Sequence, residues 1–205
     1  MKKKIISLKN EKSAILTIEK QDECCYIWAH DKNFNRIGFC QFSIYKKYSK
    51  RLDEEKRVLF AKKHKTSLEK VPYELNICVS EKNATLKNEE LLLKKDFVIN
   101  GEILTLSNGN QYQFKNNMCE LARIEILDED FFKVGLGTSM FKLMEKYIKQ
   151  KKCTEIEAFY LPNGRFQSGT HDFYVRNGFS FGYKKGHTCA NKSLSKTSEK
   201  EKTNF

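Results

Sequence analysis

The segment LDEDFFKVGLGTSMFKLMEKYIKQ (127–150) constrains the fold more than any other part of the chain. It places Gly135 and Gly137 directly before a stretch in which apolar residues recur at helical spacing. Strand-like runs lie on either side, CELARIEIL at 119–127 and CTEIEAFY at 153–160. A strand, a glycine-containing loop, a helix and a second strand together predict a β-α-β element over residues 119–160.

The two glycines have two alternative explanations. A helix that begins at Gly137 or Thr138 directs its free N–H groups and its positive dipole end back into the loop 131–137. Glycine has no Cβ, so the backbone there can approach a ligand closely, and this geometry suits a pyrophosphate. The spacing fits neither a P-loop nor a dinucleotide fingerprint. A plain turn is the alternative.

The rest of the chain predicts a mostly antiparallel sheet. Two Asn-Gly pairs, Asn100-Gly101 and Asn108-Gly109, favour tight hairpins because Asn-Gly tolerates the positive φ angles of type I′ turns. Asn177-Gly178 ends a short predicted helix at 170–179. Further strands are predicted at 13–20, 24–30, 36–45 and 72–80, and a charged helix at 51–64.

Composition indicates one globular domain over residues 1–186, followed by a polar tail, 187–205, that is expected to be disordered. No apolar run is long enough to cross a membrane, and MKKKIISL does not continue as a signal peptide, so a cytoplasmic protein is expected. Seven scattered cysteines without a Cys-x-x-Cys pair favour reduced thiols. Neither the cysteines nor the four histidines have metal-ligand spacing, so no metal is expected.

The net charge of +12 is unevenly distributed. Residues 117–183 are neutral, and much of the excess lies within residues 1–50 and 184–205. Such a distribution suits an acidic partner such as RNA, although lysines that merely keep the chain in solution explain it equally simply.

The segment 127–150 resembles, without a gap, the acetyl-coenzyme-A-binding segment of the GNAT acetyltransferase superfamily. In that family a strand end, an acidic turn and Arg/Gln-x-x-Gly-x-Gly lead into a helix. FYVRNGF (173–179) resembles the second landmark of the family, a Phe-Tyr helix followed by Gly-Phe and a final strand. The resemblance covers about residues 117–183. It implies an α+β fold, an α/β three-layer arrangement in which helices flank a mixed, mostly antiparallel sheet, here with a large β-rich insertion at 46–116.

The resemblance also implies a site. The backbone of Ile126 and Leu127 would pair with the pantetheine arm of acetyl-CoA. Tyr174 would protonate the departing thiolate, and Glu120 would deprotonate the incoming amine, directly or through water. Glu125 is the other candidate base; on a regular strand it lies on the opposite face from Glu120. The cradle for the pyrophosphate would be formed by the loop and first helical turn, at Phe132, Lys133, Val134, Gly135, Leu136, Gly137 and Thr138.

Three departures from the family pattern bear on function. Phe132 stands where the family usually has Arg or Gln, and its side chain cannot hydrogen-bond a phosphate. The usual pair of helices after the first strand has too little room before residue 36. The insertion 46–116 changes the region that normally walls the acceptor pocket, so the family's acceptors cannot be transferred to this chain.

The expected function is therefore N-acetyl transfer from acetyl-CoA to an amine by direct attack in a ternary complex. The acceptor stays open between a small molecule, a protein amine and aminoacyl-tRNA, and the oligomeric state, including a homodimer, is also open. The alternative is a GNAT-like module without catalytic activity that binds acyl-CoA or RNA.

Overall fold

The computed structural model describes residues 3–80, 84–86, 92–93, 97–160, 167–184 and 187–194. The chain divides into two compact units. Residues 1–44 and 117–205 form the first, here called the core unit, and residues 45–116 form the second, the insertion unit. The predicted insertion at 46–116 thus corresponds to a compact unit of its own. Two long strands, β4 (Arg36–Arg51) and β10 (Gln111–Ile126), each contribute residues to both units.

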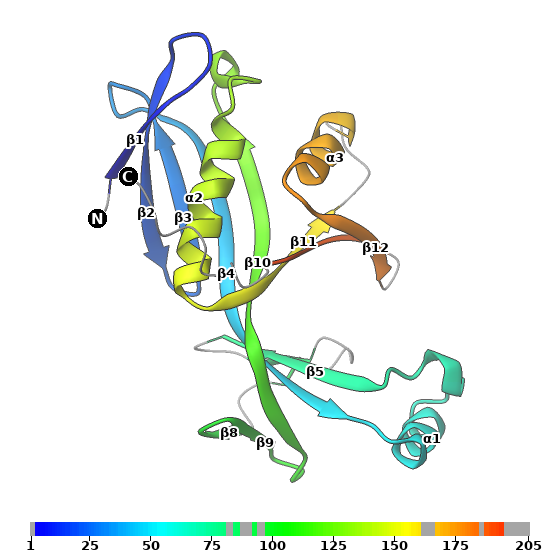
Figure 1. Cartoon of the computed structure of the whole chain (residues 1–205). Coiled ribbons are helices and arrows are strands. Elements are labelled where there is room, and N and C mark those ends of the chain that lie inside the picture. Colours follow the sequence, from blue (N-terminus) through cyan, green and yellow to red (C-terminus); the bar gives the residue numbers. More distant parts are fainter. Residues whose placement is uncertain are drawn as a thin grey trace, which may run out of the picture. The chain divides into compact units, whose positions relative to one another are not determined.

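The core unit is built on a sheet with the strand order β1-β2-β3-β4-β10-β11-β13-β12 (Figure 1). β10 and β11 pair in parallel, whereas β1–β2, β2–β3, β3–β4, β11–β13 and β12–β13 are antiparallel. The predicted mixed, mostly antiparallel sheet is therefore confirmed. Its other strands are β1 (Lys3–Ser7), β2 (Ser13–Gln21), β3 (Cys24–His30), β11 (Cys153–Tyr160), β12 (Ser180–Lys184) and β13 (His187–Ser193).

β13 corrects one prediction. Residues 187–205 were expected to form a disordered tail because the segment is polar, yet His187–Ser193 pair with both β11 and β12. Cys189 and Ala190 within β13 are both buried. Two small side chains and two ladders of backbone hydrogen bonds therefore hold this strand, although the segment is mostly polar. Residues 195–205 lie outside the described part of the chain.

The predicted helix after the glycines is α2 (Leu136–Gln150), and it lies along the sheet (Figure 1). Leu136, Met140, Met144 and Ile148 follow each other at intervals of four residues and are all fully buried. They join the core formed by alternate residues of the strands. The second helix, α3 (Gln167–Arg176), packs on the same face of the sheet, because aromatic rings of α3 contact both α2 and β12.

The insertion unit has its own sheet segments and core. Both Asn-Gly hairpins are confirmed, with Gly101 and Gly109 at φ angles of 59° and 79°. Its elements besides its portions of β4 and β10 are α1 (Glu54–Lys63), a 3-10 turn (Leu68–Lys70), β5 (Glu74–Val79), β6 (Ala84–Leu86), β7 (Leu92–Leu93), β8 (Phe97–Asn100) and β9 (Ile103–Leu106).

A buried arginine anchors α1 within the insertion unit. Arg57 is only 5% exposed, and its guanidinium donates to the carbonyl oxygens of Leu68 (2.9 Å) and Val71 (3.0 Å) and to Glu54 (2.8 Å). It also stacks on the ring of Tyr73, with 3.8 Å between the guanidinium carbon and the ring centroid. A helix with so charged a sequence is therefore fixed by a polar side chain instead of an apolar stripe.

We predict that Arg57→Ala destabilises the insertion unit by about 3 kcal/mol, because two buried carbonyl groups lose a charged donor. The matched control is Arg51→Ala at an exposed position. Guanidinium titrations check this prediction. Far-UV circular dichroism follows the unfolding of both units, whereas Trp28, the only tryptophan, lies in the core unit and reports the unfolding of that unit. Equal midpoints for Arg57→Ala and Arg51→Ala would contradict it.

Candidate cofactor and active site

The most distinctive feature of the core unit is the place where β10 and β11 part. Their parallel pairing runs from Asn117↔Cys153 to Leu121↔Ala158. Both strands continue beyond it, β10 to Ile126 and β11 to Tyr160. In the described pairing, residues 122–126 therefore have no partner on the side of β11. An unpaired strand edge offers N–H and C=O groups to an extended ligand.

Gly38 keeps the last part of β10 close to β4. A Cβ at position 38 would lie 2.8 Å from the carbonyl oxygen of Glu125 and 3.4 Å from the Cα of Ile126, so a larger residue could not occupy it without movement. The Leu127 N–H donates to the carbonyl of Ile37 at 2.9 Å, which extends this contact by one residue. β10 is thus held on the β4 side where it separates from β11, and the Leu127 N–H is already engaged.

The N-terminus of α2 has the geometry of an anion cradle. Gly135 is the N-cap residue with φ = 95°, a left-handed conformation that favours glycine. The first intrahelical bond runs from the Ser139 N–H to the Gly135 carbonyl at 3.0 Å. The N–H groups of Gly135, Leu136, Gly137 and Thr138 precede this bond, so α2 itself offers them no carbonyl one turn earlier. A Cβ at Gly135 would meet nothing within 4 Å, so open space lies in front of these donors.

Gly137 lies against the unpaired part of β10. A Cβ there would be 3.6 Å from the Phe173 ring of α3 and within 4.0 Å of the side chains of Ile124 and Ile126. The helix N-terminus, the free edge of β10 and the first residues of α3 therefore meet at one place. The sequence motif predicted this neighbourhood for Ile126 and Gly137, and it did not identify Phe173.

The turn between β1 and β2, which no sequence pattern connected to this site, lies against the candidate cradle. The Lys9 N–H donates to the carbonyl of Val134 at 3.1 Å. The Lys12 ammonium bonds to the backbone carbonyl of Asp130 and lies 4.8 Å above the Phe131 ring. Val134 itself is buried. The Lys12 ammonium also lies 4.0 Å from the carboxylate of Asp130. The turn thus fixes the loop that precedes the expected pyrophosphate position.

Phe132 and Lys133 both face outward in the loop that leads to the cradle. Phe132 is 42% exposed, and Lys133 adopts a positive φ of 58°. Phe132 is the position at which the chain departs from the family pattern. Because its ring offers no hydrogen bond, the backbone and nearby lysines have to supply the contacts to an anion.

The strand β10 contains an irregularity that changes the positions of its carboxylates. Leu121 is buried in the core on the side of α2, and Ile124 also faces α2, where it approaches Gly137. Their sequence numbers differ by three, whereas side chains on one face of a regular strand recur every two residues, so β10 has one extra residue at this point. Glu120 and Glu125 consequently lie on the same face, away from α2. The prediction that they lie on opposite faces is wrong for this reason.

Glu120 has a neighbour that the sequence did not single out. Its partner across the parallel pair is Glu157 on β11, which is only 5% exposed. This pair is the last but one before the strands part, and both residues lie on the face away from α2. Glu125 instead forms an ion pair with Arg123 at 2.6 Å. Of the two candidate bases, Glu120 therefore lies nearer to the point of separation.

Tyr174 lies within an aromatic cluster under α3. It is 8% exposed, and its ring centroid lies 5.0 Å from that of Phe179 and 5.6 Å from that of Phe173. Because Phe173 also approaches Gly137, Tyr174 is one residue away from the meeting point of α2 and β10. Its ring is held rigidly, which suits either a positioned acid or a core residue.

The cysteines are poorly suited to act as nucleophiles. Six of the seven are buried, and Cys24 is partly exposed. Burial raises the pKa of the Cys119 thiol, and it raises the pKa of Cys153 to about 12. Thiols with such pKa values are protonated at neutral pH and react slowly. Among the described residues, no group of three or more His, Cys, Asp or Glu side chains is placed to hold a metal ion.

Comparisons with known proteins find distant structural neighbours. No family model and no curated protein sequence matches the chain. Among solved structures, PaiA N-acetyltransferase of Thermoplasma acidophilum in complex with coenzyme A is 13% identical, with a TM-score of 0.41. A GNAT-family protein from Desulfovibrio desulfuricans is 11% identical (TM-score 0.41), and nourseothricin acetyltransferase is 8% identical (TM-score 0.40). The matches cover 83%, 84% and 88% of this chain and 61%, 69% and 71% of those chains, respectively.

Within the described residues, no helix is long and apolar enough to cross a membrane.

We predict that Gly135→Trp weakens binding of acetyl-CoA by about 30-fold or more, because the indole fills the space in front of the cradle and two charge-assisted hydrogen bonds are lost. Gly109→Trp is the matched control, since Gly109 also has a positive φ and open space around it but belongs to the insertion unit. Calorimetric titration checks the prediction. Equal affinities of the two variants would show that the cradle is not the binding site.

Proposed function

We propose that the chain is an N-acetyltransferase that moves the acetyl group of acetyl-CoA to an amine. The observation that carries this proposal is the separation of β10 from β11 beside the N-terminus of α2, where open space lies in front of Gly135. Acetyl-CoA has an arm that contains amides and a pyrophosphate. The strand edge of β10 can pair with the arm, and the N–H groups at the start of α2 can bind the pyrophosphate. The resemblance of residues 117–183 to the GNAT superfamily agrees with this reading.

The donor would be held by backbone groups. The pyrophosphate accepts hydrogen bonds from the N–H groups of residues 135–138 at the positive end of the α2 dipole. The pantetheine arm lies along residues 122–126 and pairs with the edge that β11 leaves free. The thioester then reaches the point of separation beside Leu121 and Ala158. Because backbone donors are present whatever the side chains are, Phe132 does not prevent binding.

The chemistry would take place at the point of separation. The amine nitrogen attacks the thioester carbon, a C–N bond forms, and the C–S bond breaks as the thiolate departs. Glu120 accepts the proton that the amine loses, and Tyr174 donates a proton to the thiolate. Holding donor and acceptor together supplies much of the rate enhancement. No acyl-enzyme is required, in agreement with the raised pKa values of the buried cysteines.

The acceptor would approach from the face of the sheet away from α2, where Glu120 and Glu157 lie. Two neighbouring carboxylates favour a protonated amine over an acidic group at this point. A small-molecule amine, a protein amine and aminoacyl-tRNA all present such an amine. A panel with one member of each class, incubated with labelled acetyl-CoA, tests the proposal directly. Failure of every class to accept label from protein that binds acetyl-CoA would favour the module without catalytic activity.

That second candidate, a module that binds acyl-CoA without turning it over, is favoured by the burial of Tyr174. A tyrosine that serves only as a core residue would be buried in the same way.

We predict that Tyr174→Phe lowers kcat by about 100-fold or more, the usual contribution of a positioned acid, while acetyl-CoA binding is unchanged. Tyr48→Phe, a buried tyrosine in the insertion unit, is the matched control. Turnover and calorimetric affinity are measured on each variant. Full activity of Tyr174→Phe would assign the residue to the core alone.

We predict that Glu120→Gln lowers kcat by about 100-fold, because a neutral amide cannot accept the proton that the amine loses. The control is Glu155→Gln. Glu155 lies two residues before Glu157 on β11, so both side chains are on the same face of the strand. Turnover and the calorimetric affinity for acetyl-CoA are measured on both variants. Equal turnover of Glu120→Gln and Glu155→Gln would exclude the assigned role.

A further inference from the structure

The face of the core sheet opposite α2 carries a series of neighbouring aromatic side chains. Tyr26 and Trp28 alternate along β3 with residues that are buried in the core, so they point to this opposite face. Their rings stack, with 5.3 Å between the centroids and 7° between the planes. Phe39 on β4 and Phe34 in the turn before β4 continue the series. We call Tyr26, Trp28, Phe34 and Phe39 the aromatic row.

Two arginines lie against the aromatic row. Phe39 is the cross-strand partner of Trp28, with 5.4 Å between the ring centroids. The guanidinium carbon of Arg36 lies 4.1 Å from the centroid of the Trp28 ring, and that of Arg123, on β10, lies 5.8 Å from the centroid of Phe39. Arg36 is an exposed residue. Nucleobases stack on guanidinium planes as they do on aromatic rings.

Phe34 is the most exposed ring of the row. Its side chain is 57% exposed at the turn between β3 and β4. His30, which follows Trp28 on the same face of β3, connects it to the other rings, with 6.5 Å between the centroids of His30 and Phe34. A planar ligand can therefore reach Phe34 from solvent.

The backbone of Phe34 shows that this exposure does not serve the fold. Its φ angle is 65°, a left-handed conformation that is an outlier for so bulky a residue. Asp31 holds the turn in this form, because its carboxylate accepts hydrogen bonds from the backbone N–H groups of Asn33 and Asn35, each at 2.8 Å. Aromatic neighbours within a sheet stabilise it, which explains the rings on β3 and β4. An exposed ring on a strained backbone gives no such stabilisation, and strain of this kind is found at ligand sites.

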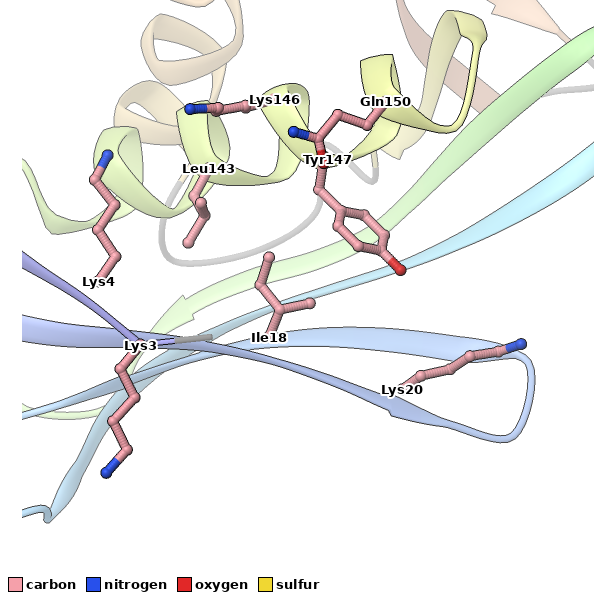
Figure 2. A pocket seen from close by; sticks show the side chains of 8 residues that line it. All are labelled: Lys3, Lys4, Ile18, Lys20, Leu143, Lys146, Tyr147 and Gln150. Atoms are coloured by element: carbon pink, nitrogen blue, oxygen red, sulfur yellow. The ribbon is translucent and has the colours of Figure 1, made fainter. Parts of the chain in front are cut away.

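Positive charge lies beside the exposed end of the row. At the cavity between α2 and the hairpin of β1 and β2, Ile18 points towards α2, whereas Lys3 points to the opposite side of the hairpin (Figure 2). The Lys3 ammonium lies 4.9 Å from the centroid of the Phe34 ring. Lys3 and Arg36 thus place two cations next to rings at this end of the row.

Carboxylates are also present near the row, and they limit which cations can bind an anion. Glu125 pairs with Arg123 at 2.6 Å, so Arg123 contributes a plane and little net charge. Glu19 is the cross-strand partner of the first ring of the row, at the end remote from the turn. Binding of an anion therefore depends on Lys3 and Arg36.

These features select a ligand that has several planar groups with negative charges between them. Single-stranded nucleic acid has both, because its bases stack on aromatic rings and its phosphates bind ammonium and guanidinium groups. RNA presents unpaired bases in its loops and ends. We propose that this face of the core sheet binds single-stranded RNA, with bases stacked at Phe34 and Arg36 and phosphates bound by Lys3 and Arg36. The inference does not depend on acetyl transfer.

The test uses the fluorescence of Trp28, which belongs to the row and is the only tryptophan of the chain. The full chain is titrated with a short single-stranded RNA of mixed sequence, with single-stranded DNA of the same sequence and with the RNA duplex. We expect the single-stranded RNA to change the emission of Trp28 and to bind more weakly as the salt concentration rises. An excess of acetyl-CoA should not displace it, since its proposed site is the start of α2.

Phe34→Asn separates binding from stability. Because asparagine tolerates the left-handed conformation, the midpoint of guanidinium unfolding should equal or exceed that of the wild type. The affinity for the RNA should fall roughly tenfold, as the loss of one stacked base does. Leu59→Asn is the matched control, since Leu59 is also apolar and 65% exposed but belongs to the insertion unit.

Arg36→Gln should weaken RNA binding by a similar factor. Arg51→Gln is its control, because Arg51 is an exposed arginine of the same strand within the insertion unit, and it should leave binding unchanged.

Four results would overturn the proposal. The first is that single-stranded RNA leaves the emission of Trp28 unchanged. The second is that the duplex or the single-stranded DNA binds more tightly than the single-stranded RNA. The third is displacement of the RNA by acetyl-CoA, which would place it at the cofactor cradle. The fourth is equal affinity within the pair Arg36→Gln and Arg51→Gln, or within the pair Phe34→Asn and Leu59→Asn.

Discussion

Burial of the apolar stripe of α2 is the interaction on which the rest of the core unit depends. Four side chains at four-residue intervals lose all contact with water, and each contributes roughly 1.5–3 kcal/mol relative to an exposed position. Because the stripe fits against alternate residues of the strands, the direction of the helix axis is set. The N-terminus of α2 must then lie beside the end of β10, and the free N–H groups of Gly135 to Thr138 follow from that packing.

The separation of β10 from β11 converts this arrangement into a site. A continuous ladder would satisfy every backbone group of β10 and leave nothing for a ligand. Gly38 holds the end of β10 against β4, and the Leu127 N–H bonds to Ile37. The strand therefore stays on that side, and its edge towards β11 is unpaired. Phe173 of α3 closes the same neighbourhood from a third direction.

Positive charge on this chain is organised at two places in the core unit. Lys9 and Lys12 belong to a turn beside the cradle, where an anion is expected. Lys3, Lys4, Lys20 and Lys146 line a cavity beside the C-terminal half of α2. The neutral segment 117–183 supplies the backbone of the candidate cradle, and lysines of the basic N-terminal strands lie along α2, so the uneven distribution of charge along the sequence has a structural counterpart.

The sequence by itself determined the elements whose signals are local. Hydrophobic periodicity placed α2, the Asn-Gly pairs placed both hairpins, and the Gly-x-Gly motif placed the start of α2 at which we propose the cradle, because each depends on neighbouring residues alone. Only the tertiary structure decided the rest. The extra residue between Leu121 and Ile124 brought Glu120 and Glu125 to one face, and pairing with β11 and β12 made a strand of the polar residues 187–193. Glu157 and Phe173 became neighbours of the candidate site, and the N-terminal lysines became neighbours of α2, through contacts between distant segments, which no local pattern records.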